Sequence, residues 1–293
     1  MKYAYFPGCS LHSTAKEYDI SSRAVADSLG IELIEIPDWA CCGATPAHLT
    51  LHLLSLALPV KNLLQAKKLG NLEVTTCCAA CFSRLKIANR FMQKNDEHRA
   101  KVEEIVGESY RGDVNTRHFL DVLVNVFGLK NLKERTIRQL SGLKAACYYG
   151  CLLTRPHDVT ELDDLEEPHL IDDLMQAIGV ETVQWPYKTE CCGASFSLTR
   201  TDIVLKLSND ILQMASDEGA EAIVVACPLC QSNLDLRQGM INKKYKKDFN
   251  IPILYFTQLV GLALGIDPKK LGLEKHIVNP MPLLKEKGIL IKP

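Results

Sequence analysis

The chain reads PDWACCGATP at residues 37–46 and YKTECCGASF at residues 187–196, so the tetrapeptide Cys-Cys-Gly-Ala occurs twice. Each copy lies in the middle of a longer cysteine pattern, with one cysteine upstream and a Cys-x-x-Cys motif downstream. The first set comprises Cys9, Cys41, Cys42, Cys78 and Cys81, and the second comprises Cys151, Cys191, Cys192, Cys227 and Cys230. The spacings match closely between the sets, which indicates an internal duplication.

Short apolar runs precede these cysteines and predict β-strands, and longer helical patterns separate the runs. We expect strands at Lys2–Phe6, Glu32–Ile36, Glu73–Cys77, Val114–His118, Ala145–Tyr149, Glu181–Trp185, Ala222–Ala226 and Ile253–Phe256. In the first half we expect helices at Thr14–Leu29, Thr45–Leu69, Phe82–Val106 and Phe119–Phe127. The tail from Pro268, with its scattered Pro and Lys, is expected to be extended.

Alternating strands and helices predict an α/β fold with two pseudo-symmetric Rossmann-like halves, each a small parallel sheet flanked by helices. We place the domains at residues 1–140 and 141–293. Ligands of such folds bind beyond the carboxyl ends of the strands. Because every patterned cysteine follows an expected strand, the five cysteines of each half should converge on one rim.

The composition limits the classes of function. A formal net charge of −1 gives no support for a nucleic-acid partner. No apolar run reaches the roughly 18 residues that would span a bilayer, and we expect a cytoplasmic protein. Twelve cysteines in a chain of this kind favour metal or redox chemistry over disulfides.

Thiolates bind iron–sulfur clusters, zinc and copper, and each half offers five of them. A zinc ion or an ordinary 4Fe–4S cube needs four, so the fifth is either a spare thiol or a ligand of a larger core. Cys41 and Cys42 point in different directions from one backbone segment, which favours a cluster over a single ion. A thioredoxin-like role for the motif Cys78–Cys81 would leave the other three cysteines of its set unexplained. Cys77 and Cys147 have no counterparts and are assigned to the core.

The duplicated pattern resembles the cysteine-rich CCG domain. A chain of this length with two such domains is similar to the B subunits of the heterodisulfide reductases of methanogens. This resemblance implies two 4Fe–4S clusters, non-cubane in form, each held by the five cysteines of one set. It also implies reduction of the coenzyme M–coenzyme B heterodisulfide to two thiols, with one electron from each cluster. The implied partners are a ferredoxin-like C subunit together with a flavin-containing A subunit, and a hydrogenase or formate dehydrogenase attached to them.

Such a substrate carries anionic groups, so we expect cationic residues near the clusters. Candidates close in sequence to the motifs are His12, His48, Arg84, Arg155, Lys188 and Arg200. Arg84 and Arg155 rank first because each follows a motif cysteine by three or four residues. Two rival hypotheses stay open: a member of another redox complex that acts on a different thiol or a quinone, and a non-catalytic scaffold that holds zinc or a cluster.

Overall fold

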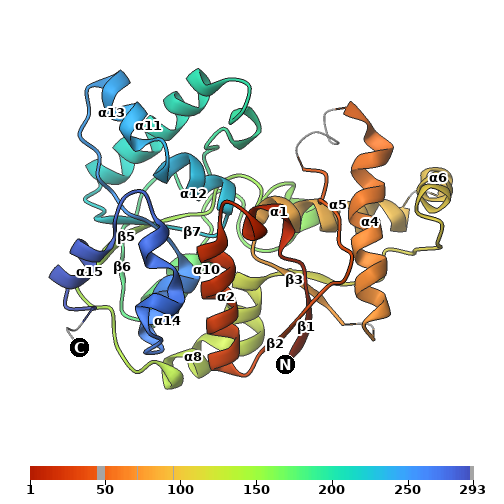
Figure 1. Cartoon of the computed structure of the whole chain (residues 1–293), viewed down its shortest axis with the longest axis horizontal. Coiled ribbons are helices and arrows are strands. Elements are labelled where there is room, and N and C mark those ends of the chain that lie inside the picture. The colour runs from red at the N-terminus through yellow and green to blue at the C-terminus, as the bar shows by residue number, and fades with distance from the viewer. Residues whose placement is uncertain (45–49, 71, 95, 291–293) are drawn as a thin grey trace.

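The computed structural model describes residues 1–44, 50–70, 72–94 and 96–290, and it contains two four-stranded parallel sheets (Figure 1). The strands of the first sheet are β1 (Lys2–Tyr5), β2 (Glu32–Glu35), β3 (Val74–Thr76) and β4 (Thr116–His118), and those of the second are β5 (Lys144–Tyr148), β6 (Glu181–Thr182), β7 (Ala222–Val225) and β8 (Ile253–Tyr255). The order is β2-β1-β3-β4 in one sheet and β6-β5-β7-β8 in the other. The expected α/β class with two pseudo-symmetric halves is therefore confirmed.

Helices connect the strands and cover the sheets. In the first half they are α1 (Gly8–His12), α2 (Lys16–Leu29), α4 (His52–Lys68), α5 (Ala79–Lys94), α6 (Asp96–Val106), α7 (Phe119–Asp121), a π-helical segment (Val122–Gly128) and α8 (Leu129–Arg135). In the second half they are α9 (His157–Thr160), α10 (Leu170–Ala177), α11 (Thr201–Asp217), α12 (Pro228–Asp235), α13 (Gln238–Tyr245), α14 (Phe256–Ala263) and α15 (Met281–Glu286), with 3₁₀ turns at Ala194–Phe196, Pro268–Leu271 and Leu273–Lys275.

Buried apolar strands explain why the sheets form. All four residues of β7 and all three of β8 are buried, as parallel sheets covered on both faces require. Helix α2 ends at Gly30, whose φ of 71° gives the left-handed conformation that glycine adopts without strain. Helices cover the faces of each sheet, and the loops that follow the strands lie at its edge.

Two of the helices expected in the first half need correction, and part of a third lies outside the described residues. The single helix expected at Phe82–Val106 is two helices, α5 and α6, and two acidic residues stabilise the first turn of α6. The helix expected at Phe119–Phe127 begins as α7 and then widens into the π-helical segment. Of the helix expected at Thr45–Leu69, residues 45–49 lie outside the described part of the chain, and α4 occupies 52–68.

The tail beyond Pro268 is folded rather than extended. It forms two 3₁₀ turns and α15, and the side chains of Leu271, Leu284 and Ile289 are buried against the body. Gly261 on α14 leaves the space that the Leu271 side chain fills. In the sequence, Pro and Lys separate these apolar residues, so they form no recognisable helical or strand pattern. Burial of their side chains stabilises the folded tail.

The two halves pack through reciprocal contacts. Helix α2 of the first half packs on α14 of the second (Figure 1). Equivalently, α10 of the second half packs on α7 of the first. Likewise α1 meets α12, and α5 meets α9. Such exchange of equivalent contacts is the signature of a two-fold arrangement. The division of the chain at residues 140 and 141 stays a prediction.

The centre of this interface is buried and partly polar. The rings of Tyr18 and Tyr255 stack with centroids 3.9 Å apart and planes inclined by 11°. Beside them, the hydroxyl oxygens of Ser21 and Thr257 are 2.7 Å apart. Aromatic stacking and a matched hydrogen bond fix how the halves are placed relative to one another.

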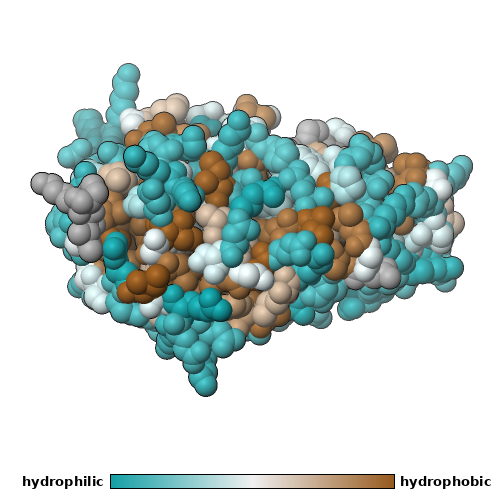
Figure 2. Space-filling model, turned by 60° about the horizontal axis from the view of Figure 1, so that its bottom comes forward, coloured by the Kyte–Doolittle hydropathy of each residue, from teal (hydrophilic) through white to brown (hydrophobic). Residues whose placement is uncertain are grey.

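Hydrophobic residues on the surface are interrupted by polar ones. Figure 2 shows that, on the face drawn, they lie in several separate patches divided by hydrophilic residues. Within the described ranges, no helix combines the length and the hydropathy needed to cross a bilayer.

Candidate metal centres

The cysteines of each set follow the ends of three strands, as the sequence predicts. In the first half, Cys9 lies on α1 after β1, and the pair Cys41–Cys42 lies in the loop after β2. After β3, Cys78 directly precedes α5 and Cys81 lies in its first turn. The second half repeats this arrangement around β5, β6 and β7. Strands β1 and β3 are neighbours from which the chain turns in opposite directions, which is where doubly wound sheets bind ligands.

Within each set the sulfur atoms are close but not bonded. The Sγ atoms of Cys42 and Cys81 are 3.4 Å apart, and those of Cys192 and Cys230 are 3.6 Å apart. A disulfide bond needs about 2.05 Å, and all twelve cysteines are free thiols. The pairing of the buried Cys-Cys-Gly cysteine with the last cysteine of the set is the same in both halves.

Among residues 1–44, 50–70, 72–94 and 96–290, no three His, Cys, Asp or Glu side chains converge as ligands of one metal ion. A structural zinc site uses four ligands in a tetrahedron, and each set offers five sulfurs. A core of several irons takes thiolates at separate metal atoms. The five soft sulfur donors of each set, with neighbouring Sγ atoms 3.4–3.8 Å apart, fit such a core.

Each set is buried on one side and open on the other. Cys42, Cys78 and Cys81 are buried, while Cys9 is exposed and Cys41 is half-buried. In the second set Cys192, Cys227 and Cys230 are buried, Cys151 is half-buried and Cys191 is exposed. The side of each set that faces solvent is therefore that of its first two cysteines.

A glycine in each half leaves room for the last cysteine of the set. Gly8 precedes Cys9 and has a φ of +70°, and a Cβ added there would lie 2.9 Å from the Sγ atom of Cys81. Gly150 precedes Cys151 with a φ of +65°, and its Cβ would lie 3.0 Å from the Sγ atom of Cys230. Both positions combine a left-handed backbone with close approach to sulfur, which only glycine tolerates.

Hydrogen bonds favour the thiolate form of the first cysteine in each Cys-Cys-Gly motif. The pKa of Cys41 is lowered to about 2 by hydrogen bonds from the Cys42 and Cys9 side chains and from backbone N–H groups. The pKa of Cys191 is lowered to about 6, first by a hydrogen bond from the Cys151 side chain. The N–H of the following glycine lies 3.4 Å from Cys41 Sγ and 3.3 Å from Cys191 Sγ. Since the thiolate is the metal-binding form, each centre has a ligand prepared for metal.

The two centres adjoin each other. Cys78 of the first set and Cys227 of the second are both buried. A hydrogen bond between their side chains is the foremost cause that raises the pKa of Cys78. The same bond, after that with Cys230, lowers the pKa of Cys227. One ring nitrogen of His118 lies within 3.1 Å of both Cys77 O and Ala226 O, the residues directly before Cys78 and Cys227, so the two sets meet at the interface between the halves.

Two polar side chains hold the loops that lead into the Cys-Cys-Gly motifs. Buried Asn62 on α4 accepts a hydrogen bond from Ala40 N at 2.7 Å and donates one to Ala40 O at 2.9 Å. In the second half, the Tyr148 hydroxyl donates to Glu190 O at 2.6 Å. Each contact fixes the residue directly before the first cysteine of the motif.

We expect Asn62→Leu to lower the iron content of the first centre and leave the second centre intact, because the substitution removes both bonds to Ala40. The unpaired backbone groups would also cost about 1–3 kcal/mol of folding stability. Metal analysis and thermal unfolding check this. Asn242→Leu is the matched control, since Asn242 binds both backbone groups of Phe249 in the same way, at 2.8 and 2.9 Å. Equal loss of iron in both variants would contradict the assignment.

The cationic candidates near the motifs are mostly engaged by protein groups. Arg155 forms an ion pair with Glu166 at 3.2 Å and donates to Thr189 O at 3.2 Å, so it supports the loop before Cys191. Arg84 donates to Ser55 O at 3.4 Å, and its Nε is buried without a hydrogen-bond partner among the described residues. The other candidates form ion pairs with acidic side chains: His12 with Glu35, Lys188 with Asp172 and Arg200 with Asp202. His48 lies outside the described residues. Substrate contact by Arg84 and Arg155 stays a prediction.

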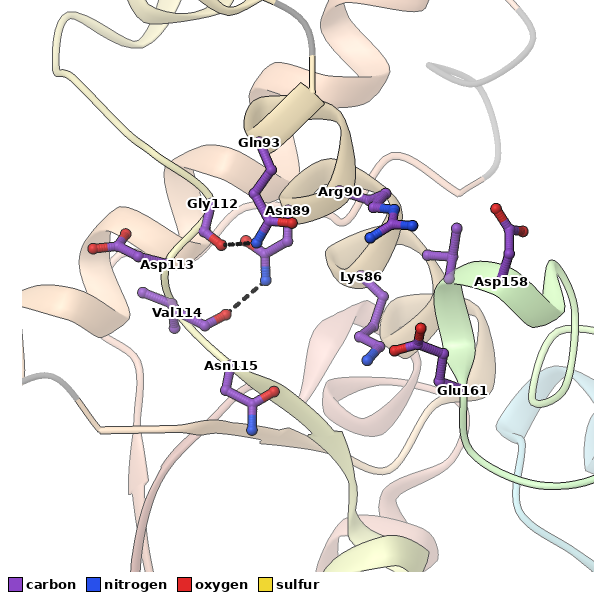
Figure 3. A pocket seen from close by; sticks show the side chains of 11 residues that line it. Lys86, Asn89, Arg90, Gln93, Gly112, Asp113, Val114, Asn115, Asp158 and Glu161 are labelled. Carbon is purple, nitrogen blue, oxygen red and sulfur yellow. Dashed lines mark hydrogen bonds between the residues drawn. The ribbon is translucent and has the colours of Figure 1, made fainter.

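A separate polar pocket of about 260 Å³ lies between α5, the segment 112–115 and the region of α9 (Figure 3). Asn89 and Gln93 on α5 close one wall by donating to Val114 O and Gly112 O. Lys86 and Arg90 face the acidic side chains of Asp158 and Glu161 across it. None of the described residues that line this pocket is a cysteine, so it is not part of either centre.

The cysteine pattern and the fold around it also occur in known proteins. A family model described as Cysteine-rich domain (CCG) matches residues 3–86 and 145–235. The chain is 33% identical to the membrane anchor subunit of the 8-methylmenaquinol:fumarate reductase of Wolinella succinogenes, covering 96% of this chain and 99% of that protein. It is 31% identical to the B subunit of the ferredoxin:CoB-CoM heterodisulfide reductase of Methanosarcina mazei, covering 97% and 96%.

Among solved structures, the crystal structure of a hypothetical protein from Helicobacter pylori is similar, with a TM-score of 0.74. The identity is 15%, and the match covers 95% of this chain and 52% of that one. At this identity the likeness shows the fold alone.

Proposed function

The chain belongs to the family of cysteine-rich CCG-domain proteins, and we propose that it is the catalytic iron–sulfur subunit of a disulfide reductase. The proposed substrate is the coenzyme M–coenzyme B heterodisulfide, and the proposed cofactors are two non-cubane 4Fe–4S clusters. The first cluster would be held by Cys9, Cys41, Cys42, Cys78 and Cys81, and the second by Cys151, Cys191, Cys192, Cys227 and Cys230.

One observation carries this proposal: the residues directly before Cys78 and Cys227 both contact Nε2 of His118, so the two cysteine sets lie next to each other. Reduction of one disulfide takes up two electrons and two protons, breaks the S–S bond and releases two thiols. A 4Fe–4S cluster transfers one electron at a time, so two clusters beside one substrate supply the pair. Two distant centres could not both lie beside one disulfide.

The residues of the chain have three tasks in this reaction. The buried cysteines would hold the metal away from water, and the substrate would enter from the exposed side near Cys9 and Cys191. The glycines before Cys9 and Cys151 let the backbone approach the sulfur atoms. The thiolates would be occupied by metal, so the proposal assigns no free nucleophilic cysteine.

Electrons must come from partners. We propose a ferredoxin-like C subunit together with a flavin-containing A subunit as donors, with a hydrogenase or formate dehydrogenase behind them, in the cytoplasm of an organism that makes methane. A relative at 31% identity carries ferredoxin and the heterodisulfide in its name. This is the support for placing the chain in such a complex.

We expect anaerobically purified protein to contain about eight irons and eight acid-labile sulfides per chain. With a reduced viologen dye as electron donor, it should reduce the coenzyme M–coenzyme B heterodisulfide to two thiols. Chelation of the iron should abolish this turnover. Two zincs per chain and no sulfide would contradict the proposal.

A second candidate function is electron exchange with a quinol, since a relative at 33% identity is named as part of an 8-methylmenaquinol:fumarate reductase. The two functions share the iron–sulfur centres and differ in substrate. Parallel assays with the heterodisulfide and with a short-chain menaquinol separate them. Turnover with the quinol alone would favour the second candidate.

A further inference from the structure

His118 is a buried residue that contacts both halves of the molecule. It is the last residue of β4, and none of its surface is exposed. Its Nε2 lies 2.9 Å from Cys77 O in the first half and 3.1 Å from Ala226 O in the second. Cys77 directly precedes Cys78, and Ala226 directly precedes Cys227. One ring nitrogen therefore joins the two strand ends that carry the adjacent cysteines.

The hydrogen-bonding pattern determines the tautomer of this ring. Nδ1 accepts a hydrogen bond from Leu120 N at 3.2 Å, so the proton is on Nε2. A single N–H at Nε2 is then shared by two carbonyl oxygens, which is a three-centre hydrogen bond. Burial lowers the pKa of His118 to about 4, so the ring is neutral near pH 7 and keeps this arrangement.

The counterpart of His118 in the second half has a different role. Tyr255 ends β8 and precedes Phe256, just as His118 ends β4 and precedes Phe119. The ring of Tyr255 stacks on Tyr18 of the first half instead of joining two backbone carbonyls. The pseudo-symmetric molecule thus joins its two cysteine-bearing strand ends with a side chain that the first half supplies.

We propose that His118 is a positioning residue that sets the separation of the two centres and so the strength of their interaction. It touches two backbone carbonyls and Leu120 N rather than a cysteine sulfur. Without its N–H, two buried carbonyls would face each other unpaired, and the strand ends with Cys78 and Cys227 would move apart. The inference rests on the proposed function only for the presence of two iron–sulfur centres, and it holds for either substrate.

Two substitutions separate the functions of the ring. His118→Asn places an amide near the Nδ1 position and keeps an acceptor for Leu120 N, as Asn does at helix N-termini, but it does not reach the two carbonyls. His118→Gln reaches the Nε2 position with an amide that donates to both. His118→Met has the reach without a donor, and it replaces the Asn variant if that protein does not fold.

The readouts are iron content, the magnetic interaction between the two reduced centres in electron paramagnetic resonance, and turnover. We expect His118→Asn to keep its iron, to lose the inter-centre interaction and to turn over on the order of 100-fold more slowly. His118→Gln should keep the inter-centre interaction, and its turnover should stay within about threefold of the parent. A threefold change is close to the smallest net contribution of a single hydrogen bond.

His276→Asn is the matched control, because His276 is also a buried histidine but its ring partners, Gln231 and Gln258, both belong to the second half. It should leave the inter-centre interaction unchanged. An unaltered interaction in His118→Asn or His118→Met would overturn the inference. Absence of two interacting centres in the parent protein would instead overturn the proposed function.

Discussion

Cys192→Ala is expected to lose about half of the iron and all of the disulfide reductase turnover. Cys192 is 2% exposed, and its Sγ lies 3.6 Å from that of Cys230. Its side chain also accepts from Asn233 at 3.6 Å, so it has a fixed place within the second set. Removing this sulfur should release the second cluster, while the first cluster keeps all five ligands. With only one centre left, the second electron has no route to the disulfide.

Cys147→Ala is the control for this prediction. Cys147 lies on β5 in the same half, is fully buried and belongs to neither set. Loss of its thiol should cost about 1–2 kcal/mol of stability through the small cavity, with iron and turnover unchanged. If Cys192→Ala kept the full iron content and remained active, the assignment of this set to a metal centre would be wrong.

Gly8→Ala is expected to reduce the iron content of the first centre and abolish turnover with little change in overall fold. The added Cβ would lie 2.9 Å from Cys81 Sγ, a separation that real side chains do not adopt. The sulfur must move, and with it a ligand of the first centre. The left-handed φ of +70° adds a cost of about 1–2 kcal/mol. Iron analysis and turnover measure the effect.

Gly30→Ala distinguishes the clash from the backbone strain. Gly30 has a nearly identical φ of +71°, but nothing lies within 4 Å of its added Cβ. This variant should show only the strain, as a fall in Tm of about 2–4 °C, and should keep its iron. Gly150→Ala, whose Cβ would lie 3.0 Å from Cys230 Sγ, should reproduce the Gly8→Ala result in the second half. If Gly30→Ala also lost iron, the loss of iron in Gly8→Ala would be due to backbone strain rather than to the contact with Cys81.

The sequence predicts the strands because their signal is local. The buried apolar run Ala222–Val225 forms β7 where a strand is expected, whereas of the strand expected at Glu181–Trp185 only Glu181–Thr182 is in the sheet. The grouping of the cysteines follows from the same pattern, since parallel strands bring their ends to one edge. The role of Cys77 and Cys147 as core residues is also confirmed, because both side chains are fully buried.

The supporting residues could not be predicted, because their partners are remote in the chain. His118 contacts Ala226, 108 residues away, and Asn62 contacts Ala40, 22 residues away. A lone buried histidine or asparagine has no periodic signature, although the strand-end position that His118 shares with Tyr255 is visible in the repeat. The tail is mispredicted for a similar reason. Its apolar residues are spaced by Pro, Lys and Gly, and only the shape of the body shows that they fit.

The adjacency of two iron–sulfur centres is tested most directly by diffraction from anaerobically grown crystals at the iron absorption edge. We expect two groups of anomalous density, one among Cys9, Cys41, Cys42, Cys78 and Cys81 and the other among Cys151, Cys191, Cys192, Cys227 and Cys230. The two groups should approach each other beside the contact between Cys78 and Cys227. Single zinc-like peaks, or iron in only one set, would contradict the account.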